Sequence, residues 1–169
     1  ANIGGAKTDI FIDESVLLQS TIDEDGTVSN HIRVTRSHFG DRSKYWWYRV
    51  PNEEYLRVLT PRGARLTNAL GGHAKKVSPP LDYEKKGFKR DPLVETMEAT
   101  IVKNVTFPEV DTFEESEKNA FGVWTTVARG KTAKLELGYT RKLPHAIRDG
   151  TTYAFILEKQ AGSRAKYSF

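Results

Sequence analysis

Cysteine is absent from this chain of 169 residues. Its absence excludes a disulfide-stapled small scaffold, a zinc site with cysteine ligands and a cysteine nucleophile. Long apolar runs are missing as well, and no stretch approaches the roughly 18 apolar residues that a membrane-spanning helix needs. No signal peptide opens the chain. We therefore expect an excised soluble piece of a longer protein, with a flexible linker over residues 1–8.

Most of the chain has no segment in which charges of one sign are concentrated. Lys and Arg number 26 and Asp and Glu number 22, which gives a formal net charge of +4, and the two signs interleave. Nucleic-acid binders usually collect positive charge on one face or helix, so no nucleic-acid partner is expected. A sustained apolar stripe with helical spacing is also missing. These absences leave an all-β domain as the class to test.

Alternating segments around turn residues are the main positive signal. In residues 27–35, Val28, Ile32 and Val34 fall on one side and Ser29 and Arg33 on the other. A period of two is typical of a half-buried strand. The Asp25-Gly26 pair just before this segment is a strong hairpin signal, because glycine takes a positive φ without steric cost.

Further extended segments follow the same pattern, with frequent turn residues between them. They cover residues 9–18, 54–60, 64–70, 96–107, 120–128, 132–140 and 151–159. Seven or eight short strands predict an antiparallel β-sandwich, immunoglobulin- or fibronectin-like in outline. The missing cysteine pair excludes an antibody-type domain. We expect a single domain over residues 9–169, in which residues 73–118 form a long insertion or irregular excursion carrying one strand.

Several of these segments together carry a resemblance to a known family. The hairpin, Tyr55-Leu56-Arg57-Val58-Leu59-Thr60-Pro61-Arg62-Gly63, Ala120-Phe121-Gly122-Val123-Trp124 and Tyr153-Ala154-Phe155-Ile156-Leu157-Glu158-Lys159-Gln160-Ala161-Gly162 stand in its order. The chain resembles the C-terminal extracellular β domain of a family of bacterial membrane-anchored proteins of unknown function, common in actinobacteria and candidate-phyla bacteria. The resemblance lapses over residues 73–118. It implies a cell-envelope location, extracellular or on the cell surface of a membrane-anchored parent protein, and a non-enzymatic role.

An aromatic loop supplies the candidate ligand-binding residues, which are Tyr45, Trp46, Trp47, Tyr48 and Arg49. Aromatic rings beside cationic side chains could stack on sugar rings, bases or peptide side chains. The alternative is that these rings plug one end of the sandwich core, because tryptophan is usually highly buried. The basic first half of residues 73–118 has the same two interpretations, a solvated excursion or a contact with anionic wall polymer or lipid headgroups.

Catalytic and metal-binding motifs are not found. Asp23-Glu24-Asp25 lacks the ligand number of a calcium loop, and His31, His38, His73 and His145 have no short metal-ligand spacing. No Gly-x-Ser-x-Gly elbow occurs. The sequence leaves open a pair of carboxylates that converge only in space, as in glycoside hydrolases. It also leaves open a buried Lys–Asn isopeptide crosslink. We expect no cofactor, no metal and no enzyme.

The sequence therefore predicts a non-enzymatic extracellular β-sandwich module with a structural, spacer or adhesion role. The first alternative is a module that binds carbohydrate or cell-wall polymer through residues 45–48, and the second is a hydrolase whose site the sequence does not show. A cell-wall glycan or another surface protein is the expected partner. The oligomeric state stays open, since an unpaired edge strand could dimerise.

Overall fold

The computed structural model describes residues 7–78, 81–157 and 164–169. Strands dominate these residues, which also form one short α-helix and three short 3-10 helices. In chain order the elements are η1 (Thr8–Phe11), β1 (Ile12–Ile22), β2 (Thr27–His38), η2 (Gly40–Arg42), η3 (Trp46–Tyr48), β3 (Asn52–Pro61), β4 (Arg65–Leu70), α1 (Pro92–Glu98), β5 (Val102–Lys103), β6 (Val110–Glu115), β7 (Lys118–Val127), β8 (Thr132–Lys142) and β9 (Lys166–Ser168).

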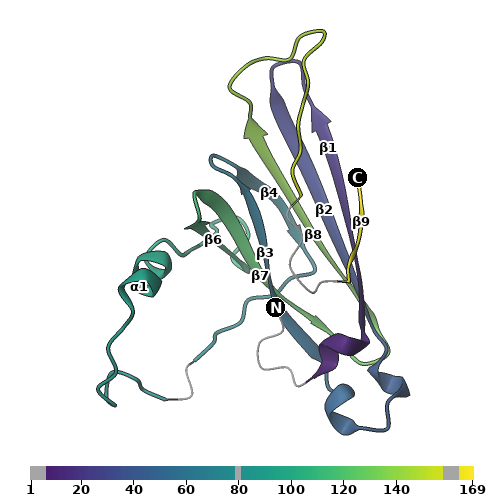
Figure 1. Ribbon diagram of the computed structural model, residues 1–169, viewed down its shortest axis with the longest axis vertical. Coiled ribbons are helices and arrows are strands. Elements are labelled where there is room, and N and C mark those ends of the chain that lie inside the picture. The colour runs from purple at the N-terminus through teal and green to yellow at the C-terminus, as the bar shows by residue number, and fades with distance from the viewer. Residues whose placement is uncertain (1–6, 79–80, 158–163) are drawn as a thin grey trace.

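Two sheets pack face to face as a β-sandwich, which confirms the predicted fold class. One sheet has five strands in the order β4-β8-β2-β1-β9, and the other has four in the order β3-β7-β6-β5. The strands β1, β2 and β8 extend beyond the second sheet, so the first sheet forms the long axis of the molecule (Figure 1). The immunoglobulin- or fibronectin-like detail stays a prediction.

The hairpin of β1 and β2 forms as its alternation predicted. The two strands pair antiparallel over eleven residue pairs, from Ile12 with His38 to Ile22 with Val28. Gly26 sits in the connecting turn with φ of 82°, in the left-handed region that favours glycine. The same alternation places Val28, Val34 and also Arg36 on the face that points to the other sheet, and all three are buried.

The core lies where β7 crosses the centre of the first sheet. Phe121 and Val123 on β7 meet Leu135 and Leu137 on β8, and each of these side chains is almost fully buried. Apolar burial of this kind stabilises by about 1.5–3 kcal/mol per large side chain. These central strands position everything that the edges of the sandwich carry.

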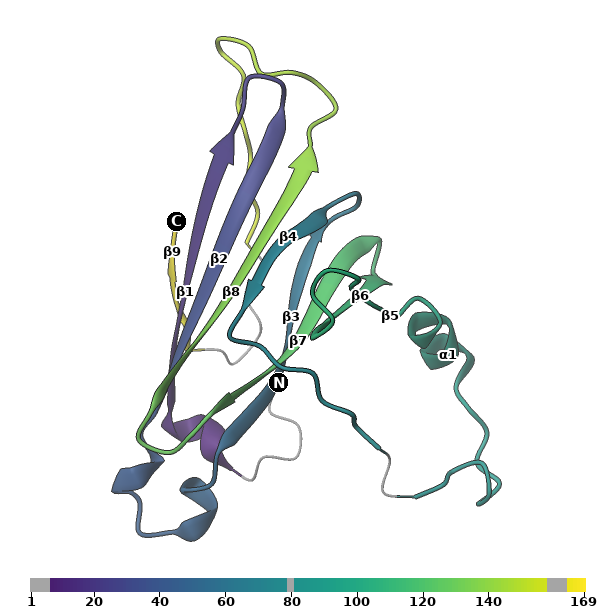
Figure 2. The same ribbon diagram turned by 180° about the vertical axis from the view of Figure 1, so that it is seen from behind.

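The stretch of residues 73–118 differs from the single strand predicted over residues 96–107. Residues 92–98 form the helix α1, because Asp91 caps its first turn by accepting hydrogen bonds from Leu93 and Val94 and because Pro92 stands at its start. The stretch then supplies two strands, β5 and β6. The strand β6 pairs with β7 and buries Val110 and Phe113. Residues 81–91, before α1, project from the body as an exposed arm (Figure 2).

The C-terminal segment also differs from its prediction. The described part, residues 151–157, has no strand pairing, although a strand was predicted over residues 151–159, of which 158 and 159 lie outside the described residues. Instead, β9 pairs in parallel with β1 over only three residue pairs. Exposed apolar side chains remain at Phe155, Ile156 and Leu157. This side of the sandwich, where the short strand β9 ends one sheet beside β1 and β3 ends the other, is therefore the least regularly covered.

Candidate functional site

The predicted aromatic residues gather in one loop at the end of the sandwich where β2 stops. The loop spans η2 and η3 and returns to the sheet at β3. None of the residues of η3 is buried, and Trp46 is 69% exposed. The interpretation that these tryptophans plug the core is therefore wrong for Trp46.

Within the loop, the four rings form one connected group, which we call the aromatic cluster (Tyr45, Trp46, Trp47 and Tyr48). Tyr45 stacks on Trp47, with ring centroids 4.8 Å apart and planes 19° apart. Trp46 meets the edge of Trp47 at 6.0 Å. Tyr48 anchors the group to the domain, because its ring lies 5.1 Å from that of Phe11 on η1. The result is a supported platform with Trp46 as its outermost ring.

The buried side chain of His38 fixes both ends of this loop. Its Nδ1 atom accepts a hydrogen bond from the Gly40 amide at 2.9 Å, and its Nε2 atom lies 2.9 Å from the Val50 carbonyl oxygen, to which it donates. A side chain at Gly40 would collide with the Tyr48 carbonyl oxygen and with the His38 ring. The tight turn at Gly40 and the two bonds of His38 therefore hold the aromatic cluster in place.

Cations flank the aromatic cluster. The Lys44 ammonium lies 5.1 Å from the centroid of the Tyr45 ring, and the Arg42 guanidinium lies 5.2 Å from that of Phe39. Arg49, the fifth predicted residue, is exposed at the end of η3. Such an arrangement offers ring faces for stacking and positive charge for an anionic group beside them.

A second polar group, which the sequence interpretation missed, crosses between the sheets. Arg36 on β2 is buried, and its Nε atom lies 3.2 Å from Glu14 on β1 and 3.0 Å from Glu54 on β3. Its Nη2 atom donates to the side chain of Asn52, which in turn donates to Asp9. We call Glu14, Arg36, Asn52 and Glu54 the charge cluster. It joins β1, β2, β3 and η1.

The ionisation of Glu14 follows from this burial. Loss of solvent raises the pKa of its carboxyl above the ordinary value of 4.5, and the negative charge of Glu54 raises it further, while Arg36 offsets part of the effect. Two converging carboxylates would suit a hydrolase. Here, however, the Arg36 guanidinium stands between them as a shared partner, so the pair serves first to hold the two sheets together.

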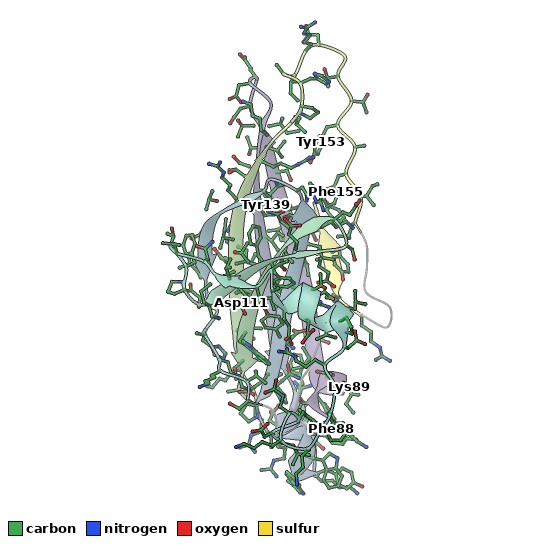
Figure 3. All side chains as sticks on the ribbon, turned by 90° about the vertical axis from the view of Figure 1, so that its left-hand side faces the viewer. Phe88, Lys89, Asp111, Tyr139, Tyr153 and Phe155 are labelled. Carbon is green, nitrogen blue, oxygen red and sulfur yellow. The ribbon has the colours of Figure 1, made fainter. Side chains whose placement is uncertain are left out.

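Beside the charge cluster, the sandwich contains a cleft of about 790 Å³ between the sheets. Side chains of β1, β2 and β3 form its walls, and Tyr153 to Leu157 and Phe169 cover its outer side. Figure 3 shows Tyr139, Tyr153 and Phe155 in the upper half of the molecule. Volumes of roughly 300–1,000 Å³ with mostly apolar linings are typical of small-molecule sites.

The remaining candidates from the sequence do not form sites. The parts of the chain that the structure describes contain no group of three or more His, Asp or Glu side chains suited to a metal. Asp25 is used in the hairpin turn, where it accepts from the Thr27 amide and from Lys142. Its pKa is lowered to about 2 mainly by the bond from Lys142. No lysine is buried among the described residues, as an isopeptide crosslink would require.

A scan against protein-family models finds no matching family, and searches of curated proteins and of solved structures find no match. Within the described ranges, no helix is long and apolar enough to span a membrane. Any function therefore has to be argued from the geometry of the two sites.

Proposed function

We propose that this chain is a non-catalytic binding module of a bacterial cell-envelope protein and that it recognises a surface glycan through the aromatic cluster. The exposure of Trp46 carries the proposal. A large ring that neither packs in the core nor lies on a flexible tail is available for a ligand. The location rests on the family resemblance of the sequence.

The arrangement of the rings favours a sugar over other ligands. A pyranose ring presents a face of C–H groups, which are attracted to the electron-rich face of an aromatic ring. The stacked pair of Tyr45 and Trp47 stiffens the support behind Trp46. Because the rings are already ordered by His38 and Phe11, binding loses little conformational entropy. Lys44 and Arg42 beside them favour a polymer that carries anionic groups.

The test is binding of purified cell-wall polysaccharide and of arrayed glycans to the intact chain and to Trp46→Ala. We expect the variant to bind roughly tenfold more weakly or worse, because burial of one large ring stabilises by about 1.5–3 kcal/mol. Its melting temperature should stay unchanged, since the indole is exposed in the free protein.

A matched control is Phe88→Ala. Phe88 is an exposed aromatic side chain next to Lys89 (Figure 3), on the projecting arm, which leaves the body on the other side from residues 40–50 (Figure 2). Binding that falls equally in both variants would indicate general stickiness and contradict the proposal. Absence of glycan binding by the intact chain would leave a spacer or protein-adhesion role as the better account.

A further inference from the structure

The cleft between the sheets has apolar walls over most of its length. Its inner wall comes from the first sheet and the facing wall from β3, as the alternation of each strand requires. The apolar side chains of these two walls are Val16, Leu18, Ile32, Val34, Leu56 and Val58. Of these, Val16, Ile32, Leu56 and Val58 are only partly buried in the protein alone. A ligand that covered them would therefore remove apolar surface from water.

The two ends of the cleft differ in charge. The charge cluster closes one end, where Glu14 and Glu54 share Arg36. The other end, beyond Thr60 on β3, is lined by three cations and one acid, namely Arg62, Lys118, Arg141 and Glu117. An elongated ligand with one negative end would therefore enter in a single orientation, with the charge near Arg141.

Arg141 is suited to hold that charge. It is half-buried on β8 and contacts Tyr153, whose hydroxyl accepts from Nη2 at 3.4 Å and whose ring centroid lies 5.9 Å from the guanidinium carbon. Among the described residues, no carboxylate lies within ion-pair distance of it. A guanidinium keeps several donors for a planar anion, and the Tyr153 hydroxyl keeps its proton to donate. Burial also raises the pKa of the neighbouring Tyr139, so its phenol stays a protonated donor.

We propose that this cleft binds an alkyl carboxylate with a single unbranched chain. The carboxylate lies against Arg141 and the Tyr153 hydroxyl, and the chain runs between Leu18 and Val58 toward the charge cluster. The aromatic cluster lies beyond the charge cluster at the other end of the domain, so this site is separate from the proposed glycan site.

The test is titration of the intact chain with decanoate below its micelle concentration, followed by calorimetry and by amide chemical shifts. We expect saturable binding of one molecule, with shifts concentrated on β1, β3 and residues 153–157. Decanol, which has the same chain and no charge, should bind roughly tenfold more weakly, because the charge-assisted hydrogen bonds are lost. Equal binding of decanol and decanoate would contradict the role of Arg141.

Two variants locate the ligand. Val58→Trp fills the cleft and should abolish binding, whereas the control Val105→Trp adds the same ring at a side chain that is 98% exposed and does not line the cleft. Arg141→Gln should weaken decanoate by roughly tenfold and leave decanol unchanged. If Val58→Trp fails to fold, the binding of Arg141→Gln and the amide chemical-shift changes still test whether the ligand lies in the cleft. Non-saturable binding, or binding that neither variant alters, would overturn the proposal.

Discussion

The centre and the open edge of this sandwich are built from the same kinds of apolar residue but are packed differently. Leu137 on β8 is almost fully buried, whereas Leu56 on β3, also facing the other sheet, is only partly buried beside the cleft. The central strands lie between two long neighbours, while β3 ends its sheet and β1 has only the short strand β9 beyond it. Burial in a sandwich is therefore set by the neighbouring strands as much as by the side chain.

The largest expected loss of stability comes from truncating one leucine at the centre of the sandwich and, for comparison, one beside the cleft. Leu137→Ala should lower the free energy of unfolding by about 4 kcal/mol and Leu56→Ala by about 2 kcal/mol, because the cost grows with the cavity that remains. Urea unfolding of the two variants measures the difference. Equal losses would show that the cleft is as tightly packed as the centre and would break the comparison.

A smaller loss is expected when the charge cluster is broken. Arg36→Ala leaves the partly buried carboxylates of Glu14 and Glu54 without their shared partner and should cost about 3 kcal/mol. The control is Arg33→Ala on the opposite face of the same strand, where the side chain is 41% exposed and pairs with Glu136 at 2.7 Å. That change should cost less than about 1 kcal/mol. Thermal unfolding that shifts equally in both would remove the cross-sheet role of Arg36.

The smallest effect concerns pH. Because burial raises the pKa of Glu14, the native state holds this proton more tightly than the unfolded chain. The ionised carboxylate therefore destabilises the fold above its raised pKa, and the penalty disappears as the pH falls through that pKa to the ordinary value of 4.5. Glu14→Gln lacks this dependence, so the stability gap between variant and native protein should change with pH over this interval. Parallel pH profiles in denaturant unfolding would contradict the assignment.

Much of the fold could be predicted because period-two alternation reports one buried face. The β1–β2 hairpin, β3, β4, β7 and β8 all follow from it. The strand β6 was missed because acidic residues dominate its sequence, although Val110 and Phe113 are buried. The helix α1 was missed although Asp91-Pro92 is a helix-start signal. Residues 96–107 contain enough apolar alternation to resemble a strand. The helix capped by Asp91 nevertheless continues through Glu98, into the first residues of that range.

The sites could be predicted less completely. Its composition identified the aromatic loop as a candidate site. The exposure of Trp46, however, depends on the tertiary contact between η3 and η1. Arg36 had a usable signal, since it shares the parity of Val28 and Val34 along β2 and must point inward. Its two carboxylate partners come from other strands, and the cleft depends on the spacing between sheets. Neither follows from local sequence.

The parallel contact of β9 with β1 has a mechanical consequence. The two strands run in the same direction, with Ser15 beside Lys166 and Leu17 beside Ser168. Tension applied between the start of β1 and the end of β9 would shear all three residue pairs at once instead of unzipping them one by one. The long β1–β2 ladder would still hold when this short one gives way. A pulled molecule would thus release β9 first and uncover the cleft while the rest of the sandwich stays folded.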